Sequence, residues 1–333
     1  MSENIIEVRN LTRRYGDLVA VDHINFNVIR GEVFGFLGPN GAGKTTTISM
    51  LTTLLKPTDG TATVGGYDIV HQQDRVREEI GIVFQEPSLD ERLTAAENLE
   101  FHAVLYNVPA AERRERIMMV LRMVQLEGRA NDQVERFSGG MKRRLEIARG
   151  LLHTPRVLFL DEPTIGLDPQ TRRSLWDYIL GLREQTDITI FMTTHYMDEA
   201  EFCDRIAIID QGHIVALDTP ESLKGQVGGD VVTVTAPNGT GELASFARQN
   251  DLPFAQRQNE VRFEVEDGAR FIPRLVRDFP GAIESINLRR PTLDDVFLKL
   301  TGRTIRELEL DEKDIARNRF QRRLAMRGRG RRR

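Results

Sequence analysis

The sequence predicts an α/β fold, because short apolar strands alternate with helical segments and a glycine-rich turn joins one strand to one helix. Residues 33–37 read as a buried strand, and helical spacing follows over residues 44–55. After Pro220, three glycines (Gly225, Gly228 and Gly229) precede a new strand. This third feature predicts a second, smaller α+β domain. Further strands of the first part are expected at residues 5–8, 20–29, 80–84, 157–160, 188–193 and 206–209.

Two regions stand apart from this sheet. Residues 94–106 and 110–126 read as helices, with Pro109 at the start of the second, within a helical subdomain spanning about 94–155. Strands and helices alternate again after Pro220 in an order compatible with a ferredoxin-like unit. Its elements are expected at 231–235, 243–248, 254–257, 261–265, 269–279 and 283–288, followed by a helix over 293–300. The predicted division is a domain over 1–225, an accessory domain over 226–302 and a charged, arginine-rich tail over 303–333.

Composition excludes several classes of protein. With 40% hydrophobic and 29% charged residues, the 333-residue chain is typical of a soluble protein of about two domains. No apolar run approaches the roughly 20 residues that cross a bilayer, and the start lacks the pattern of a secretory signal. Cys203 is the single cysteine, which excludes an intramolecular disulfide and a multi-cysteine metal site. We therefore expect a cytoplasmic protein.

The glycine-rich turn fits the phosphate-binding pattern G-x-x-x-x-G-K-[ST] and lies between a predicted strand and a predicted helix, as that pattern requires. Its glycines allow successive N–H groups to point inward, and the following helix directs its positive end toward phosphate. Lys44 supplies a charge for the terminal phosphates, and the Thr45 hydroxyl is suited to ligate Mg²⁺. A surface lysine on an ordinary turn would not explain the flanking elements. The turn, called the Gly38 loop below, reads Gly38-Pro39-Asn40-Gly41-Ala42-Gly43-Lys44-Thr45.

Two adjacent carboxylates, Asp161 and Glu162, follow the apolar strand at 157–160. They are expected at the carboxyl edge of a parallel sheet, where ligands bind in such folds. Asp161 is suited to hold Mg²⁺ through water, and Glu162 to orient and deprotonate the attacking water. Paired carboxylates are common on surfaces, so the interpretation depends on the preceding strand and on the Gly38 loop.

Three other residues are weaker candidates. Gln85 ends a strand and would reach the metal or the water, although a lone glutamine is usually a strand-end cap. His195 also ends a strand, where an imidazole would contact the γ-phosphate, although lone histidines are more often structural. Tyr15 lies in a polar loop and would stack on adenine, although an ordinary surface tyrosine is an equal alternative.

The run Phe137-Ser138-Gly139-Gly140-Met141, followed about twenty residues later by Leu160-Asp161-Glu162-Pro163, resembles the ABC transporter signature and its Walker B strand. The ordered motifs from residue 5 to residue 223 resemble an ATP-binding cassette throughout. This resemblance implies a P-loop NTPase cassette with an antiparallel β edge, a helical subdomain, and ATP and Mg²⁺ as its ligands. The implied nucleotide-binding residues are Tyr15, Gly38, Asn40, Gly41, Ala42, Gly43, Lys44, Thr45 and Thr46; the implied catalytic residues are Glu162, His195 and Gln85; the implied Mg²⁺ ligands are Thr45, Gln85 and Asp161.

The resemblance also implies a head-to-tail dimer with a second copy or a related cassette. ATP would lie between the Gly38 loop of one cassette and the turn formed by Ser138, Gly139 and Gly140 of the other. That turn opens a predicted helix, which supplies further N–H donors for the γ-phosphate. Asp168 would help to join the two sites. Met141 departs from the family pattern, in which glutamine is commonest, and this puts one detail of the contact across the dimer in doubt.

The Ser-Gly-Gly-Met form and the C-terminal segment from Pro291 to Gly302 resemble the daunorubicin-type drug-resistance exporter ATPases. The implied function is ATP hydrolysis that powers a separate membrane permease for drug or antibiotic efflux, at the cytoplasmic face of the membrane. Residues 94–126 would contact the permease. Cassettes that export lipids or polysaccharides share much of the pattern, and no residue of this chain identifies the substrate.

The basic end of the chain has three interpretations. The basic run at 317–333 would suit a soluble ABC ATPase acting on nucleic acid or ribosomes, or an anionic lipid surface, as well as a solvated end. Nucleic-acid-acting relatives usually carry two fused cassettes or a long coiled-coil insert, and neither is found here, which makes nucleic acid the poorer candidate. The C-terminal domain lacks a cluster of catalytic residue types and is expected to act as a regulator.

Overall fold

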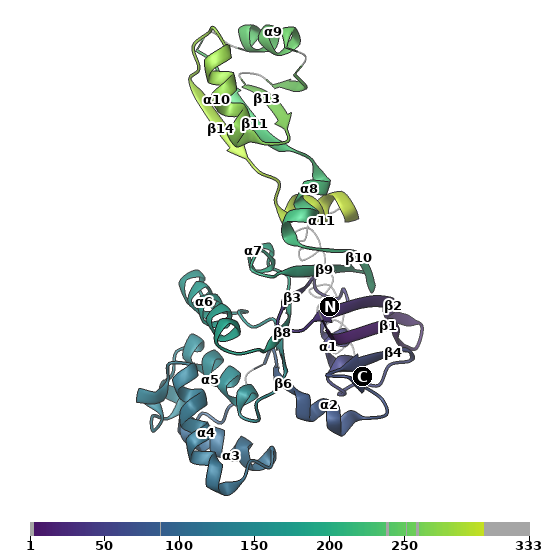
Figure 1. The fold of residues 1–333 in the computed structure, drawn as a ribbon, viewed down its shortest axis with the longest axis vertical. Coiled ribbons are helices and arrows are strands. Elements are labelled where there is room, and N and C mark those ends of the chain that lie inside the picture. Colours follow the sequence, from purple (N-terminus) through teal and green to yellow (C-terminus); the bar gives the residue numbers. More distant parts are fainter. Residues whose placement is uncertain (1–2, 87, 238–239, 251, 258–259, 303–333) are drawn as a thin grey trace, which may run out of the picture. The chain divides into compact units, whose positions relative to one another are not determined.

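The computed structural model describes residues 3–86, 88–237, 240–250, 252–257 and 260–302 (Figure 1). The chain forms two compact units, with the division between Thr219 and Pro220. The predicted tail at 303–333 lies outside the described residues.

The first unit is built on a six-stranded sheet in the order β10-β9-β3-β8-β7-β6. Its strands β9, β3, β8, β7 and β6 run parallel, and β10 pairs antiparallel with β9 at one edge. Every residue of β3, β7 and β8 is buried, as expected of central strands covered on both faces. The α/β class predicted from the sequence is confirmed. The strands are β3 (Val33–Leu37), β6 (Ile80–Val83), β7 (Val157–Asp161), β8 (Thr189–Thr194), β9 (Arg205–Asp210) and β10 (His213–Asp218).

A separate antiparallel sheet in the order β2-β1-β4-β5 forms the β edge of this unit. Its first strand is longer than predicted, because register shifts between Val8 and Leu11 and again beyond Leu11 interrupt the alternation that marks a strand in sequence. The Phe26 ring of β2 stacks on Phe34 of β3 at 5.6 Å between centroids, which places the two sheets around one core. The strands are β1 (Asn4–Tyr15), β2 (Leu18–Ile29), β4 (Asp59–Val64) and β5 (Tyr67–Asp68).

The helices of the first unit largely follow the predicted pattern. Helix α1 ends at Leu51 instead of Leu55, because Thr53 adopts a left-handed conformation (φ 64°) that stops the helix. Thr94 opens α3 with a capping box, and Pro109 precedes α4. Helices α3, α4 and α5 gather at one end of the unit (Figure 1). The helices are α1 (Lys44–Leu51), α2 (Gln73–Glu79), α3 (Ala95–Leu105), α4 (Ala110–Met123), α5 (Gly139–Leu151), α6 (Pro169–Gln185) and α7 (Met197–Ala200), with 3-10 turns at Glu127–Arg129 and Val134–Arg136.

The second unit has a fully antiparallel sheet in the order β12-β13-β11-β14, which is the strand order of a ferredoxin-like βαββαβ unit. The boundary predicted after residue 225 falls inside α8, whose last carbonyls at Gln226 and Val227 accept hydrogen bonds from Lys299 of α11. Pairing of α8 with α11, which are distant in sequence, explains why α8 belongs to this unit. Its elements are α8 (Pro220–Val227), β11 (Asp230–Thr235), α9 (Gly241–Gln249), β12 (Phe254–Arg257), β13 (Glu260–Val265), α10 (Gly268–Asp278), β14 (Ser285–Arg289) and α11 (Leu293–Thr301).

Candidate nucleotide-binding and hydrolysis site

The Gly38 loop joins β3 to α1 and is fixed by close backbone packing. Gly43, the N-cap of α1, has φ 110°, and a Cβ atom there would lie 2.6 Å from the Ala20 carbonyl oxygen. A Cβ atom at Gly38 would lie 2.3 Å from the Ile209 carbonyl oxygen. These two positions therefore require glycine, and the loop leads directly into the N-terminal end of a helix, where anions bind.

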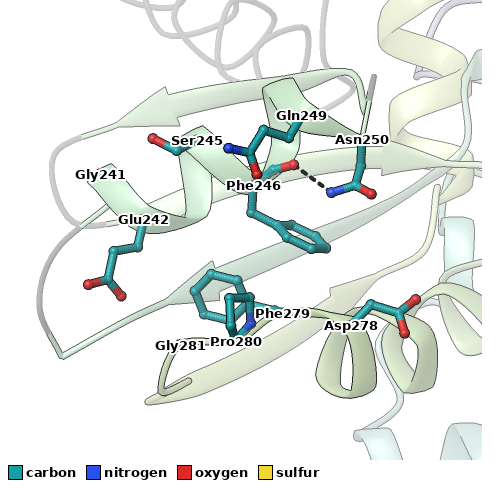
Figure 2. Close-up of a pocket in the computed structure, with 10 residues that line it drawn as sticks. All are labelled: Gly241, Glu242, Ser245, Phe246, Gln249, Asn250, Asp278, Phe279, Pro280 and Gly281. Atoms are coloured by element: carbon teal, nitrogen blue, oxygen red, sulfur yellow. Dashed lines mark hydrogen bonds between the residues drawn. The ribbon is translucent and has the colours of Figure 1, made fainter.

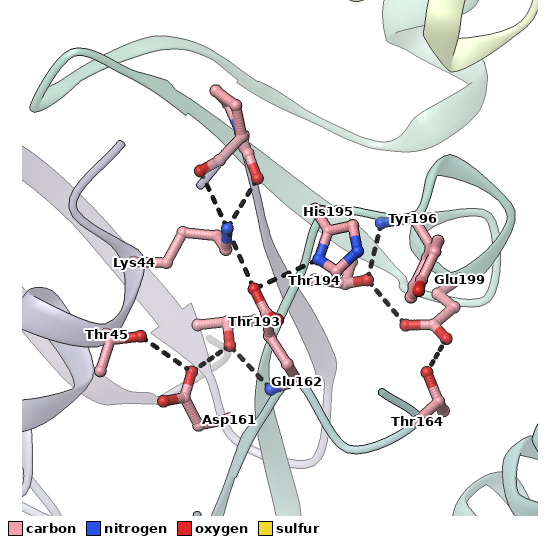
Figure 3. A network of polar contacts seen from close by, with 12 residues as sticks. Lys44, Thr45, Asp161, Glu162, Thr164, Thr193, Thr194, His195, Tyr196 and Glu199 are labelled. Carbon is pink, nitrogen blue, oxygen red and sulfur yellow. Dashed lines mark hydrogen bonds and ion pairs between the residues drawn. The ribbon is translucent and has the colours of Figure 1, made fainter. Parts of the chain in front are cut away.

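Lys44 is the first residue of α1, and its side chain is only 4% exposed. Its Nζ atom donates to the carbonyl oxygens of Gly38 (2.8 Å) and Pro39 (2.9 Å) and lies 3.2 Å from Glu162 Oε1 (Figure 3). The lysine is thus held within the loop and paired with the carboxylate at the end of β7.

The β7 strand ends in the buried carboxylate of Asp161. Its Oδ1 atom accepts a hydrogen bond from Thr193 Oγ1 at 2.5 Å and a longer one from Thr45 Oγ1 at 3.5 Å. Burial raises the pKa of Asp161, while the hydrogen bonds from the two threonines oppose that rise. The structure therefore brings Thr45 and Asp161 together.

Glu162 follows β7 in a left-handed backbone conformation, with φ 45°. Such a conformation costs a non-glycine residue on the order of 1–3 kcal/mol and is concentrated at functional sites. Burial by itself would raise the pKa of Glu162, but a hydrogen bond from His195 and the charge of Lys44 hold that pKa below its usual value. His195 Nδ1 lies 3.3 Å from Glu162 Oε1. The carboxylate is therefore ionised at neutral pH and lies between two nitrogen groups (Figure 3).

Thr193 is a site residue that the sequence analysis missed. Besides contacting Asp161, its Oγ1 atom accepts a hydrogen bond from the Glu162 amide at 3.0 Å. The signal lay in strand register, because Asp161 of β7 pairs with Thr193 of β8. Sequence pattern placed both residues at strand ends but not opposite each other.

A second missed group surrounds Glu199, which is 1% exposed. Its carboxylate accepts hydrogen bonds from the hydroxyl groups of Thr194 (2.7 Å) and Thr164 (Figure 3). Arg172 of α6 lies 3.7 Å from the same carboxylate and stacks on Tyr196 at 4.0 Å from the ring centre. This group links the end of β8, next to His195, with the segment after Glu162.

The Ser138 turn lies at the start of α5. Ser138 is the N-cap and its side chain accepts a hydrogen bond from the Met141 amide at 3.3 Å. Ser138 and Gly139 are exposed, whereas Gly140 is buried against α6, where a Cβ atom would lie 2.5 Å from Thr171 Cγ2. Gly140 is thus required for helix packing, a reason that the sequence did not reveal.

Three other predicted residues, Asp168, Gln85 and Tyr15, are exposed. Asp168 is the N-cap of α6 and accepts hydrogen bonds from the amides of Gln170 (3.1 Å) and Thr171 (3.0 Å). Gln85 is exposed and follows the end of β6. Tyr15, at the end of β1, is 46% exposed, and the Arg13 guanidinium lies 4.6 Å from its ring centre.

A pocket in the second unit differs in chemistry from this site. It has a volume of about 770 Å³ and lies beside α9 and the end of α10 (Figure 2). The Phe246 and Phe279 rings meet edge to face there, and Glu242 and Asp278 add carboxylates. Among the described residues that line it, none is a lysine, arginine or histidine that would attract a phosphate.

No helix in the described ranges combines the length and the apolar character that crossing a bilayer requires.

Known proteins share both parts of this architecture. Residues 21–165 match the family described as ABC transporter, and residues 219–301 match the domain described as ATP-binding protein DrrA1-3-like, C-terminal domain. The linearmycin resistance ATP-binding protein LnrL of Bacillus subtilis (strain 168) is 39% identical over 312 residues, which cover 91% of this chain and 100% of the relative. The daunorubicin resistance ATP-binding protein DrrA3 of Streptomyces coeruleorubidus is 39% identical over 91% of this chain and 97% of the relative.

A third relative, the Nod factor export ATP-binding protein I of Burkholderia orbicola (strain AU 1054), is 39% identical over 92% of this chain and 100% of its own length. Among solved structures, cbiO1 of Clostridium perfringens, part of an ABC transporter complex, aligns with a TM-score of 0.63 and 32% identity over 66% of this chain and 90% of that chain. A dimeric ATP-binding cassette in a post-hydrolysis state with ADP and Pi aligns with a TM-score of 0.57 and 30% identity over 64% of this chain and 98% of its own. With the phosphate loop and the acidic strand end in place, the chain belongs to the ABC transporter family, as an ATP-binding subunit that hydrolyses ATP and carries a DrrA1-3-like C-terminal domain.

Proposed function

We propose that this chain powers the export of a drug or antibiotic by hydrolysing ATP, with Glu162 as the general base. The observation that carries the proposal is the buried contact of Glu162 with Lys44 and His195. The lowered pKa of Glu162 keeps the carboxylate ionised, which is the form that accepts a proton from water. Lys44 and the N-terminal end of α1 would bind the phosphates, and His195 would orient the Glu162 carboxylate next to the γ-phosphate.

The donor set at Thr45 and Asp161 fits Mg²⁺. The Thr45 hydroxyl, at the end of the Gly38 loop, lies 3.5 Å from the buried carboxylate of Asp161. Both groups offer the oxygen ligands that this ion prefers. Within the described residues no cluster of three or more His, Cys, Asp or Glu suits a metal ion by itself, so phosphate oxygens and water would complete the coordination. When bound, Mg²⁺ would neutralise charge that develops on the phosphates. Gln85 would join this set through water from its exposed position.

The active unit in this proposal is a head-to-tail dimer. One chain has one Gly38 loop and one Ser138 turn, and Ser138 and Gly139 of that turn are exposed, where a second cassette would meet them. Asp168, also exposed, would contact the second cassette near the same place. The dimeric form of a similar solved cassette supports this arrangement. Tyr15 would stack on the adenine, because its hairpin leads to Ala20, which packs on Gly43 of the loop.

The permease would contact the helical subdomain. Helix α3 and its C-cap expose large apolar side chains, with Phe101 and Leu105 both 59% exposed. An exposed apolar patch is typical of a protein contact. The names of two relatives concern drug resistance and favour a drug or antibiotic as the exported compound. A relative named for Nod factor export has the same identity, so a substrate other than a drug is the second candidate, with lipid or polysaccharide export as its class.

A role for the accessory domain also belongs to this proposal. The second unit has its own hydrophobic core, built from the strands and helices of that unit. We assign it a regulatory role in the cassette dimer.

The Glu162→Gln variant tests the proposed base. Glutamine keeps the size of the side chain but cannot accept a proton as a base, so ATP should bind with nearly unchanged affinity while turnover falls by roughly 100-fold or more. ATP binding is measured by equilibrium titration, turnover by phosphate release, and dimer formation by size-exclusion chromatography with ATP.

Glu184→Gln is the matched control, since Glu184 is exposed near the end of α6. Its turnover should equal that of the unmodified chain. Normal phosphate release by Glu162→Gln would remove Glu162 as the base.

A further inference from the structure

A buried arginine of α5 contacts the backbone on both sides of Glu162. Arg143 is 6% exposed. Its Nη2 atom donates to the carbonyl oxygens of Asp161 (3.2 Å) and Glu162 (3.3 Å). Its Nε atom donates to the Pro163 carbonyl at 2.6 Å. One guanidinium thus holds three successive carbonyl groups of the turn that presents Glu162.

The same guanidinium is anchored on its other side. Its Nη1 atom donates to the Phe84 carbonyl (2.5 Å), next to Gln85, and to Glu146 Oε2 (2.8 Å). Glu146 is 1% exposed, and its Oε1 atom accepts a hydrogen bond from the Ser88 amide at 2.9 Å. Arg143 is therefore fixed in orientation by a buried carboxylate that also holds the chain beyond Gln85. The planar fork of donors in arginine suits several acceptors at once.

The turn at Glu162 depends on such support. A left-handed backbone at a non-glycine residue persists only where neighbouring groups hold it. Thr193 holds the Glu162 amide, and Arg143 holds the carbonyls before, at and after that residue. If the carbonyls lost Arg143, the backbone at Glu162 would be free to return to a right-handed conformation, and the carboxylate would turn away from Lys44.

We propose that Arg143 is a positioning residue for ATP hydrolysis, which holds the Glu162 carboxylate in line with the phosphate site by fixing the backbone of residues 161–163. This proposal rests on the assignment of Glu162 as the base. The hydrogen bonds of Arg143 go to backbone carbonyl groups and to Glu146, so its loss should alter the rate of the chemical step and leave ATP affinity nearly unchanged.

The first experiment compares Arg143→Met, Arg143→Lys and a control in the full chain. Arg143→Met should lower kcat at least about tenfold with a change in ATP affinity of less than about threefold, because a misplaced catalytic group slows the reaction without weakening binding. Arg143→Lys should recover only part of kcat, since one ammonium group cannot span the same carbonyls. Unchanged kcat in Arg143→Met would overturn the proposal.

Arg205→Met is the control for loss of a partly buried arginine outside the site. Arg205 pairs with the buried Glu32 (3.3 Å) and donates to the Asn27 carbonyl (3.4 Å). It lies at the start of β9, at the edge of the parallel sheet opposite the carboxyl ends. Arg205→Met should lower the melting temperature but leave kcat unchanged. An equal fall of kcat in both variants would reduce Arg143 to a structural residue and overturn the proposal.

The second experiment combines Arg143→Met with Glu162→Gln and measures residual turnover under single-turnover conditions. If Arg143 acts through Glu162, the double variant should be as slow as Glu162→Gln alone. A further loss in the double variant, equal to that of Arg143→Met alone, would overturn the proposal. Normal turnover of Glu162→Gln would instead overturn the role of Glu162 as the base. If Glu162→Gln turns over ATP slowly while Arg143→Met turns it over at the normal rate, only the role of Arg143 is overturned.

If Arg143→Met does not fold, Glu146→Gln provides the test, because it weakens the anchor of Arg143 and keeps the arginine. It should lower kcat less than the arginine variant would, again with ATP affinity unchanged, and an unaltered kcat would overturn the proposal.

Discussion

Glu162 combines a strained backbone with a carboxylate whose pKa is lowered in a buried position. Burial disfavours the ionised carboxylate, and the nearby nitrogen atoms of Lys44 and His195 reverse that effect. The backbone is held by Thr193 on its amide side. Reactivity at this residue therefore depends on neighbours from two other segments of the chain, the start of α1 and the end of β8.

The Thr193→Val variant tests the hydrogen bonds of Thr193, because it removes the hydroxyl group and nearly keeps the volume of the side chain. Valine fills the same space but leaves the Glu162 amide and Asp161 Oδ1 without the Thr193 hydroxyl, which should cost about 1–3 kcal/mol of stability and lower kcat by roughly tenfold. Phosphate release and urea unfolding measure the two effects. Thr193→Ser retains the hydroxyl and should restore most of the rate; equal rates for the valine variant and the unmodified chain would contradict this role.

At the scale of elements, α5 connects the Ser138 turn with α6 and with the turn at Glu162. It begins at the Ser138 cap, packs Gly140 on α6, and carries Arg143 beneath the turn at Glu162. Asp168 bonds to the Thr171 hydroxyl at 2.5 Å, which fixes the rotamer of Thr171 and keeps its methyl group against Gly140. The start of the signature helix is thus set by contact with a neighbouring helix.

Gly140→Ala should destabilise the first unit by about 1–3 kcal/mol, because the added methyl group would overlap Thr171 Cγ2 at 2.5 Å. Addition of Thr171→Ser removes that methyl group, keeps the hydroxyl on Asp168, and should restore most of the stability. Urea unfolding of the two single variants and the double variant measures the coupling. Additive effects of the two substitutions would show that the contact with Thr171 is not the cause.

At the scale of the whole molecule, the chain contains two units with separate cores. The core of the second unit is centred on Val232, Val234 and Phe263, which are fully buried within one sheet and its helices. Because its strand pairs and helix contacts lie within that unit, we expect it to unfold independently of the cassette.

Phe263→Ala tests this independence. The substitution should lower the stability of the second unit by about 3–5 kcal/mol, since it leaves a cavity in a closed core. The only tryptophan, Trp176, lies in the first unit, so its fluorescence reports on that unit, whereas circular dichroism reports on both. Urea should produce an earlier transition by circular dichroism with an unchanged transition by fluorescence. A joint shift of both signals would mean that the two units unfold as one.

Local pattern determined much of the fold. Apolar runs such as residues 157–160 identified buried strands because these strands are covered on both faces, and Thr94 and Pro109 marked helix starts because caps and proline act locally. The Gly38 loop was predictable because its chemistry lies in consecutive residues. The bulged β1 and the early end of α1 were not, since both depend on pairing or backbone conformations that composition does not specify.

The sequence by itself determined which residue types could handle phosphate, together with their order along the chain. Tertiary structure decided which of them meet: the register of β7 with β8 set Thr193 beside Asp161, and the packing of α5 under β7 set Arg143 on the carbonyls around Glu162. It also decided that α8 pairs with α11 in the second unit. The physical reason is that hydrogen bonds and close packing act over a few ångströms in space, between residues that sequence spacing alone does not bring together.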